Sequence, residues 1–183
     1  MLYLMVSFVL SFVSTMWLVR YSHVHARLSQ DHDLSGVQKF HMTPVPRVGG
    51  LGIALGLLGF AIMAQWREHP QSSSIWLLLA CAIPAFGAGL VEDLTKRVSP
   101  LWRLIFTAIS AVLAGFLIDA TINRLGIWGL DAVISIGVVG LIFTAFAVAG
   151  IANAINIIDG FNGLASVVAC GMLASLFYVA FYV

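Results

Sequence analysis

The chain has 183 residues, of which 61% are hydrophobic and only 9% are charged. A soluble domain carries about 25% charged residues, so this composition excludes one and predicts an integral membrane protein built from helices. The formal net charge of +1 gives no reason to expect nucleic acid as a partner. The two cysteines, Cys81 and Cys170, each lie inside an apolar run and are interpreted as packing residues.

Six apolar segments predict about six transmembrane helices in an all-α fold, at residues 2–20, 48–65, 75–91, 102–119, 132–152 and 163–183. Each is close to the ~20 residues that a helix needs to cross ~30 Å of hydrocarbon. The first segment is interpreted as a retained span, because no Lys or Arg precedes it and its apolar run is too long for the hydrophobic region of a signal sequence. The last reaches Val183 without a charged stop, so residues 1–183 are expected to form one transmembrane domain, the first half of a larger polytopic fold.

The basic residues predict the orientation of these spans. Seven of them lie in or beside the first and third connections, and two lie on the opposite side: Arg20, Arg27, Lys39, Arg47, Lys96, Arg97 and Arg103 against Arg67 and Arg124. Because Lys and Arg favour the cytoplasmic side, the odd-numbered connections are expected in the cytoplasm and the N-terminus outside. On the outer side, residues 120–131 are interpreted as a short interfacial turn with Trp128 as its aromatic anchor. Pro84 is expected to kink the third span.

The first cytoplasmic connection runs from Lys39 through two prolines to Arg47 and Gly49-Gly50 at the start of the second span. Free amides at a helix start, with Lys and Arg nearby, suit an anion such as phosphate. The alternative is ordinary anchoring by positive charge, with Pro and Gly as loop residues. This segment alone favours the alternative.

The second of the cytoplasmic connections, between the third and fourth spans, begins with adjacent carboxylates, Glu92 and Asp93, at the border of the membrane. Carboxylates there are costly unless they are hydrated or paired. They are suited to hold Mg²⁺ or to accept a proton from a nucleophile. Alternatively, Glu92 pairs with Lys96 and Asp93 with Arg97, each four residues further along a helix.

The third of the cytoplasmic connections, between the fifth and sixth spans, carries the densest polar cluster, between Asn153 and Ala165. On a helix, Asn153, Asn156 and Asp159 step by three and share one face. Amide and carboxylate oxygens are hard ligands that Mg²⁺ takes, usually together with substrate phosphates. The alternative is hydrogen bonding of amides between helices. The three connections together describe a cytoplasmic site for a phosphorylated substrate with Mg²⁺.

Three motifs in the same order resemble the polyprenyl-phosphate N-acetylhexosamine-1-phosphate transferases, the glycosyltransferase-4-type membrane enzymes. The family includes phospho-MurNAc-pentapeptide transferase and the enzymes that initiate O-antigen and enterobacterial common antigen. The motifs are Pro44-Val45-Pro46-Arg47-Val48-Gly49-Gly50, Glu92-Asp93 and Asn153-Ala154-Ile155-Asn156-Ile157-Ile158-Asp159-Gly160-Phe161-Asn162-Gly163-Leu164-Ala165. The resemblance covers about residues 39–165.

The resemblance implies transfer of a sugar 1-phosphate, an N-acetylhexosamine 1-phosphate, from a UDP-sugar to undecaprenyl phosphate, with release of UMP and with Mg²⁺. It implies Asn156 and Asp159 as Mg²⁺ ligands and Asp93, Glu92 and Asp159 as catalytic residues. The substrate contacts that it implies are Lys39, Arg47, Asn153 and Asn162. It also implies the bacterial inner membrane, a role in cell-wall or lipopolysaccharide biosynthesis, and the lipid bilayer as surroundings. A homodimer is compatible with it.

The chain departs from the family pattern at three points. Glu92 stands where the family has an aspartate, and Asn162 stands where many members have one. The family's later loops, with a further aspartate and a histidine-rich segment, are not in these residues, so this part alone is expected to be inactive. Two other classes stay open: a non-catalytic scaffold or polyprenyl-phosphate-binding membrane protein, and a small transporter. The transporter is disfavoured because the polar clusters lie at the ends of spans.

Overall fold

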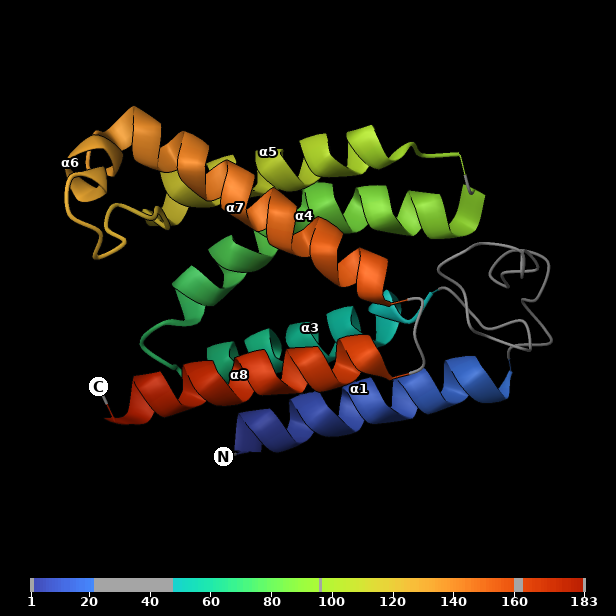
Figure 1. The fold of residues 1–183 in the computed structure, drawn as a ribbon. Coiled ribbons are helices and arrows are strands. Elements are labelled where there is room, and N and C mark those ends of the chain that lie inside the picture. The colour runs from blue at the N-terminus through green and yellow to red at the C-terminus, as the bar shows by residue number, and fades with distance from the viewer. Residues whose placement is uncertain (1, 22–47, 96, 160–162, 183) are drawn as a thin grey trace.

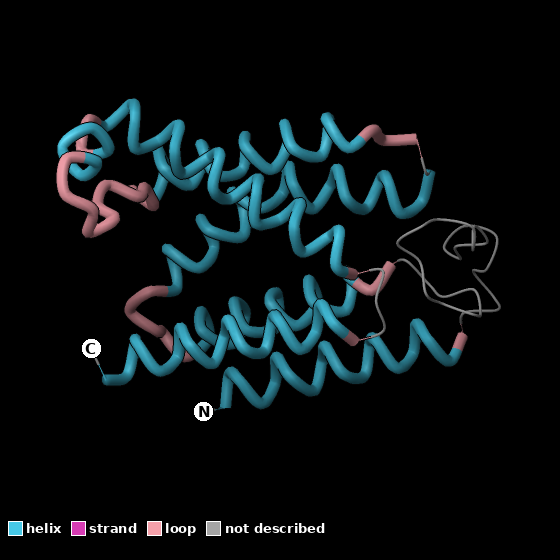
Figure 2. Tube along the Cα trace, viewed as in Figure 1, coloured by secondary structure: helices cyan, strands magenta, loops and turns pink. Residues whose placement is uncertain are grey.

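The computed structural model describes residues 2–21, 48–95, 97–159 and 163–182, and these residues form helices and connecting turns without a strand. The helices are α1 (Leu2–Arg20), α3 (Gly50–Trp66), α4 (Ser72–Thr95), α5 (Pro100–Ile118), α6 (Leu130–Ile134), α7 (Gly137–Ile158) and α8 (Leu164–Tyr182). Figure 2 shows the same all-helical trace. Five of them, α1, α4, α5, α7 and α8, are long and apolar enough to cross a membrane, and α3 is a shorter apolar helix of 17 residues.

All six predicted segments are therefore helical, but the bounds of two of them were wrong. The third segment continues to Thr95 instead of ending at residue 91, and the fifth runs from Gly137 to Ile158 instead of 132–152. A hydropathy boundary falls at the first polar residue, whereas the backbone ladder continues for as long as residues can adopt helical angles. The polar residues Glu92, Asn153 and Asn156 consequently lie on helices and not in loops.

Helices α1 and α3 pack closely through small residues. Gly52 and Gly56 of α3 face Thr15 and Ser11 of α1, and a Cβ atom at Gly56 would lie 2.9 Å from the Cβ atom of Ser11. Helices in membranes associate where such small residues let the backbones approach. The two helices form one side of the molecule, in the lower part of Figure 1.

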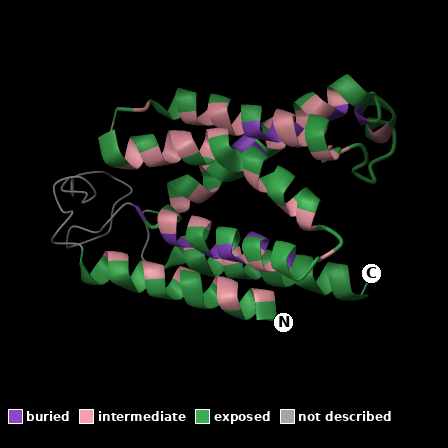
Figure 3. Cartoon of the chain, turned by 180° about the vertical axis from the view of Figure 1, so that it is seen from behind, coloured by how far each residue is buried: buried purple, intermediate pink, exposed green. Residues whose placement is uncertain are grey.

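Helices α4, α5 and α7 form the other packed group. Its buried residues are again small, and Cys81, Ser110 and Ala149 come one from each helix. Among the described helices, α8 contacts only α7. Most of the remaining helix surface is exposed (Figure 3), as expected for helices whose apolar side chains would face lipid.

The helix ends that flank the first, third and fifth connections lie at the same end of the molecule, on the right in Figure 1. These are the ends of α1, α4 and α7 and the starts of α3, α5 and α8. The predicted gathering of the three polar connections at one end therefore agrees with the arrangement of the helices. Their assignment to the cytoplasm remains a prediction from the basic residues.

The opposite end carries the predicted turn before α7, and it includes a short helix, α6, that was not predicted. The Asp131 carboxylate accepts hydrogen bonds from the backbone N–H groups of Leu125 (2.7 Å) and Gly126 (3.1 Å). Gly126 has a φ of 75°, an angle that a residue with a Cβ rarely adopts. The turn presents Trp128 with 99% of its surface exposed. The apolar ring at the tip fits the expected contact with a membrane interface.

Candidate active site

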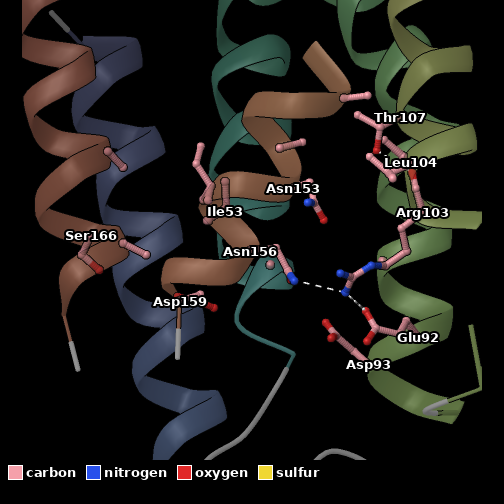
Figure 4. A pocket seen from close by; sticks show the side chains of 18 residues that line it. Ile53, Glu92, Asp93, Arg103, Leu104, Thr107, Asn153, Asn156, Asp159 and Ser166 are labelled. Atoms are coloured by element: carbon pink, nitrogen blue, oxygen red, sulfur yellow. Dashed lines mark hydrogen bonds and ion pairs between the residues drawn. The ribbon is translucent and has the colours of Figure 1, made fainter. Parts of the chain in front are cut away.

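A pocket of about 540 Å³ opens at the end of the molecule where α4 and α7 end and α3, α5 and α8 begin. Five helices contribute to its wall: α3, α4, α5, α7 and α8. Its charged and amide side chains are Glu92, Asp93, Arg103, Asn153, Asn156 and Asp159. The rest of the wall is mainly small or apolar, with glycine and alanine from four of the helices. The pocket thus combines a polar cluster with an apolar wall (Figure 4).

Glu92 and Asp93 lie on the last turn of α4, which reaches Thr95. The Thr95 hydroxyl donates to the Val91 carbonyl over 2.6 Å and so satisfies one of the carbonyls at the end of the helix. Both carboxylates line the pocket. The partner of Glu92 in the structure is Arg103 of α5, whereas the predicted pairing with Lys96 falls outside the described residues.

Arg103 is the site residue that the sequence did not reveal. Its Nη1 atom lies 2.5 Å from Glu92 Oε2 and donates to Asn156 Oδ1 over 3.3 Å. The side chains of Arg103 and Glu92 are only 21% and 23% exposed. Arg103 therefore connects α4, α5 and α7 at the polar end of the pocket (Figure 4).

The short connection before α5 is the signal from which Arg103 could have been found. Only four residues separate Thr95 from Pro100, so α4 and α5 must run antiparallel. The first turn of α5, with Arg103, then lies beside the last turn of α4, with Glu92. Sequence reasoning used Arg103 only as one of the basic residues that set orientation.

The amide cluster lies on the last two turns of α7. The helix runs to Ile158, and Asp159 retains right-handed helical angles as its C-cap, so the predicted spacing by three holds in the structure. Asn153 is half-buried and Asn156 and Asp159 are exposed, and all three line the pocket. Figure 4 shows Asn153 and Asn156 directed from α7 toward Arg103. The three side chains thus meet the α4 carboxylates across one pocket.

The remaining predicted contacts, Lys39, Arg47 and Asn162, lie outside the described residues, so their roles stay predictions. Gly163, where the description resumes, has a φ of 77°. Such an angle suits glycine and marks a change of direction before α8.

The side chains of the pocket include ligand types that the predicted Mg²⁺ takes. In the part of the chain that the structure describes, no three His, Cys, Asp or Glu side chains come together in a metal-binding group. Mg²⁺ nevertheless binds through one or two carboxylates, retained waters and substrate phosphates, and it does not need such a cage. The oxygens of Asn156 and Asp159 at the pocket wall are of the type that it takes.

Fold and site together describe a multi-pass helical membrane protein with a charged pocket at the ends of its spans. The family model described as glycosyl transferase family 4 matches residues 75–183, more than half of the chain. The chain belongs to this family, which is the polyprenyl-phosphate hexosamine-1-phosphate transferase group that its motifs resemble.

Curated relatives agree with this assignment. The chain is 27% identical over 137 residues to the decaprenyl-phosphate N-acetylglucosaminephosphotransferase of Mycobacterium tuberculosis, a match that covers 69% of this chain and 32% of the relative. The protein of the same name from Mycobacterium leprae is 28% identical over 137 residues, with 69% and 33% covered. The chain thus spans about a third of the length of the curated relatives it matches. No solved structure matches it.

Proposed function

We propose that the full-length protein transfers an N-acetylhexosamine 1-phosphate from a UDP-sugar to a polyprenyl phosphate, undecaprenyl phosphate in the bacterial inner membrane, in cell-envelope polysaccharide biosynthesis. One observation carries the proposal: carboxylate, guanidinium and amide groups from three helices meet at the polar end of a pocket whose wall is otherwise small and apolar. The charged phosphates of the two substrates would suit the polar end of the pocket, and the long lipid chain would suit its apolar wall. The names of the relatives supply the same class of reaction.

In the proposed reaction, an oxygen of the lipid phosphate attacks the β-phosphorus of the UDP-sugar. A new P–O bond forms between the lipid phosphate and the sugar phosphate, and the bond from the β-phosphorus to the bridging oxygen breaks. The bridging oxygen leaves with UMP, and the product is a lipid-linked sugar diphosphate. Such a transfer depends mainly on positioning and on neutralisation of charge, and requires little covalent chemistry from the protein.

The pocket residues divide these tasks by charge. Asp93 would accept the proton of a monoprotonated lipid phosphate, or position that phosphate, and Glu92 would keep the Arg103 guanidinium in place. Arg103 would face the phosphate oxygens, because a guanidinium is suited to paired contacts with them. Asn156 and Asp159 would hold Mg²⁺, which when bound supplies neutralisation of the diphosphate charge. Lys39, Arg47, Asn153 and Asn162 are the proposed substrate contacts.

The test is Mg²⁺-dependent release of UMP by the full-length protein in membranes, with UDP-N-acetylhexosamines and undecaprenyl phosphate as substrates. Asn156→Ala and Asp159→Ala are expected to abolish release while leaving membrane insertion intact. The matched control is Asn123→Ala, an exposed asparagine in the connection at the opposite end of the molecule, which should release UMP at the wild-type rate.

Two results would each overturn a part of the proposal. One is full activity of both Asn156→Ala and Asp159→Ala, which would remove the proposed Mg²⁺ site. The other is binding of polyprenyl phosphate by the wild-type protein without UMP release from any common UDP-N-acetylhexosamine, which would favour the non-catalytic binding protein.

A further inference from the structure

Helix α4 changes direction midway along its length (Figure 1), and Pro84 lies inside it. Proline has no N–H, so the carbonyl four residues earlier, at Ala80, loses its helical partner, and the ring presses against that carbonyl. All four α4 residues that line the pocket follow the proline: Ala85, Gly89, Glu92 and Asp93. The orientation of the half-helix after Pro84 therefore decides where the two carboxylates stand.

A serine on the neighbouring helix contacts the chain directly after the kink. The Ala85 N–H donates a hydrogen bond to the Ser110 hydroxyl oxygen over 3.0 Å, from α4 to α5. Ser110 is buried, at 9% exposure. A backbone N–H in hydrocarbon needs a partner, and hydroxyls of neighbouring helices supply one where proline disturbs the ladder. The bond thus joins the kink in α4 to the middle of α5.

This hydrogen bond and the Glu92–Arg103 ion pair lie on one seam between the two helices. Glu92 is seven positions after Ala85, and Ser110 is seven positions after Arg103, so the two antiparallel helices meet one heptad apart in matched register. The half-helix after Pro84 is therefore fixed to α5 at both of its ends. One attachment lies inside the predicted span, and the other lies in the pocket.

We propose that Ser110 is a positioning residue: its hydroxyl holds the half of α4 that follows Pro84 against α5 and so sets where Glu92 and Asp93 stand. The expected effect of Ser110 on the rate rests on the proposed function. Its effect on the position of the half-helix after Pro84 does not depend on that function. Glu92 lies about 10 Å along the helix from Ala85, at 1.5 Å per residue, so a tilt of about 10° would move it by about 2 Å. A misplacement of about 1 Å can cost about a hundredfold in rate.

The first experiment compares Ser110→Ala with a matched control, Ser175→Ala, in the full-length protein. Ser175 lies on α8, and its hydroxyl donates to the Gly171 carbonyl of its own helix, so its loss disturbs no contact between helices. We expect Ser110→Ala to lower kcat for UMP release by about tenfold or more, with little change in KM for the UDP-sugar, and Ser175→Ala to leave both unchanged.

The second experiment measures the geometry without activity, by disulfide crosslinking between α4 and α5. Ala88→Cys with Thr107→Cys reports the half-helix after Pro84, since these positions lie on the same seam, three residues inside Ala85 and Ser110. Ala114→Cys with the native Cys81 reports the half before it. Both double-cysteine variants also carry Cys170→Ala, and the 88–107 variant carries Cys81→Ala as well, so that these two native cysteines do not form other crosslinks. Ser110→Ala should lower the crosslinking rate of the 88–107 pair several-fold and leave the 81–114 pair unchanged.

A third variant links the effect to the proline. Without the proline ring, Pro84→Ala lets α4 continue unkinked, so the Ala85 N–H can bond the Cys81 carbonyl of its own helix instead of Ser110. Ser110→Ala added to Pro84→Ala should then cause no further loss of rate or crosslinking. Wild-type behaviour of Ser110→Ala in both assays, equal losses in both cysteine pairs, or independent effects of the two substitutions would each overturn the proposal. If the wild-type protein released no UMP, the proposed function would fail, and the crosslinking rates would still decide the role of Ser110. If Pro84→Ala did not fold, the two crosslinking pairs in the Ser110→Ala background would decide it.

Discussion

The two ends of the molecule each hold an arginine–carboxylate pair, and the pairs differ in what they join. Arg103 and Glu92 are 2.5 Å apart, about four-fifths buried, and come from two helices. Arg124 and Asp131 are 3.8 Å apart within one connection, and the Arg124 side chain is 83% exposed. An exposed pair contributes about 0–1 kcal/mol, whereas partly buried charges need their partners. Only the first pair holds separate helices around a pocket, and this contrast marks the functional end.

Among changes to the two ion pairs, removal of Arg103 should have the largest effect. Arg103→Ala deletes the contact between α4, α5 and α7 and the guanidinium proposed to face the phosphates. Loss of one such donor costs about 10²–10³ in kcat, so a fall of that size is expected in UMP release. Arg124→Ala is the matched control at the other end and should keep the wild-type rate. Equal losses in the two variants would remove the distinction between the ends.

Changes at Glu92 should have the next largest effect. Glu92→Gln keeps the shape but removes the charge that holds Arg103, and a fall of about tenfold to a hundredfold in UMP release is expected. Glu92→Asp restores the residue of the family pattern and should stay within about tenfold of the wild type. Steady-state rates measure both variants, with Glu68→Gln as a control on an exposed carboxylate in the turn between α3 and α4. A fully active Glu92→Gln would show that the ion pair has no part in the reaction.

The sequence predicted the apolar helices and the spacing of the polar residues on α7, and it misplaced some of the helix ends. Hydropathy found all six apolar helices because burial in lipid demands long apolar runs. It ended the third and fifth too early, because Glu92 and Asn153 are polar but compatible with a helix. The step of three from Asn153 to Asp159 was predicted correctly, since it depends only on helical periodicity.

The side-chain contacts between helices could not be predicted from the sequence. Arg103 joins Asn156, 53 residues away, and this depends on the packing of α5 against α7, which no local pattern contains. The bond from Ala85 to Ser110 depends likewise on the register of α4 and α5. Pro84 predicted a kink but not its partner, because several side chains on a neighbouring helix can reach a freed amide.

At the opposite end, Asp131 should affect stability and not activity. Asp131→Ala removes the acceptor of two backbone hydrogen bonds in the turn before α7. A loss of about 1–2 kcal/mol in the free energy of unfolding is expected from two such bonds at an exposed site. Thermal unfolding in detergent measures it, while UMP release at low temperature should remain at the wild-type rate. A large loss of activity without loss of stability would contradict the account of this end.

Arg124→Ala should have the smallest effect, within about 0.5 kcal/mol of the wild-type stability, because the Arg124 side chain is largely exposed to water and ions. Unfolding curves at low and high salt measure it. Since salt screens exposed charges, the small difference should shrink further as the ionic strength rises. A loss above about 2 kcal/mol would show that this pair is more than a surface contact.

The fate of the β-phosphorus tests most directly whether the protein moves a sugar together with its phosphate. Full-length protein in membranes would receive a UDP-N-acetylhexosamine radiolabelled at the β-phosphorus, with undecaprenyl phosphate and Mg²⁺. We predict that the label enters the lipid fraction, that unlabelled UMP is released in equal amount, and that Arg103→Ala lowers both rates by about 10²–10³-fold. Label recovered in released UDP, or in no lipid product, would contradict this prediction.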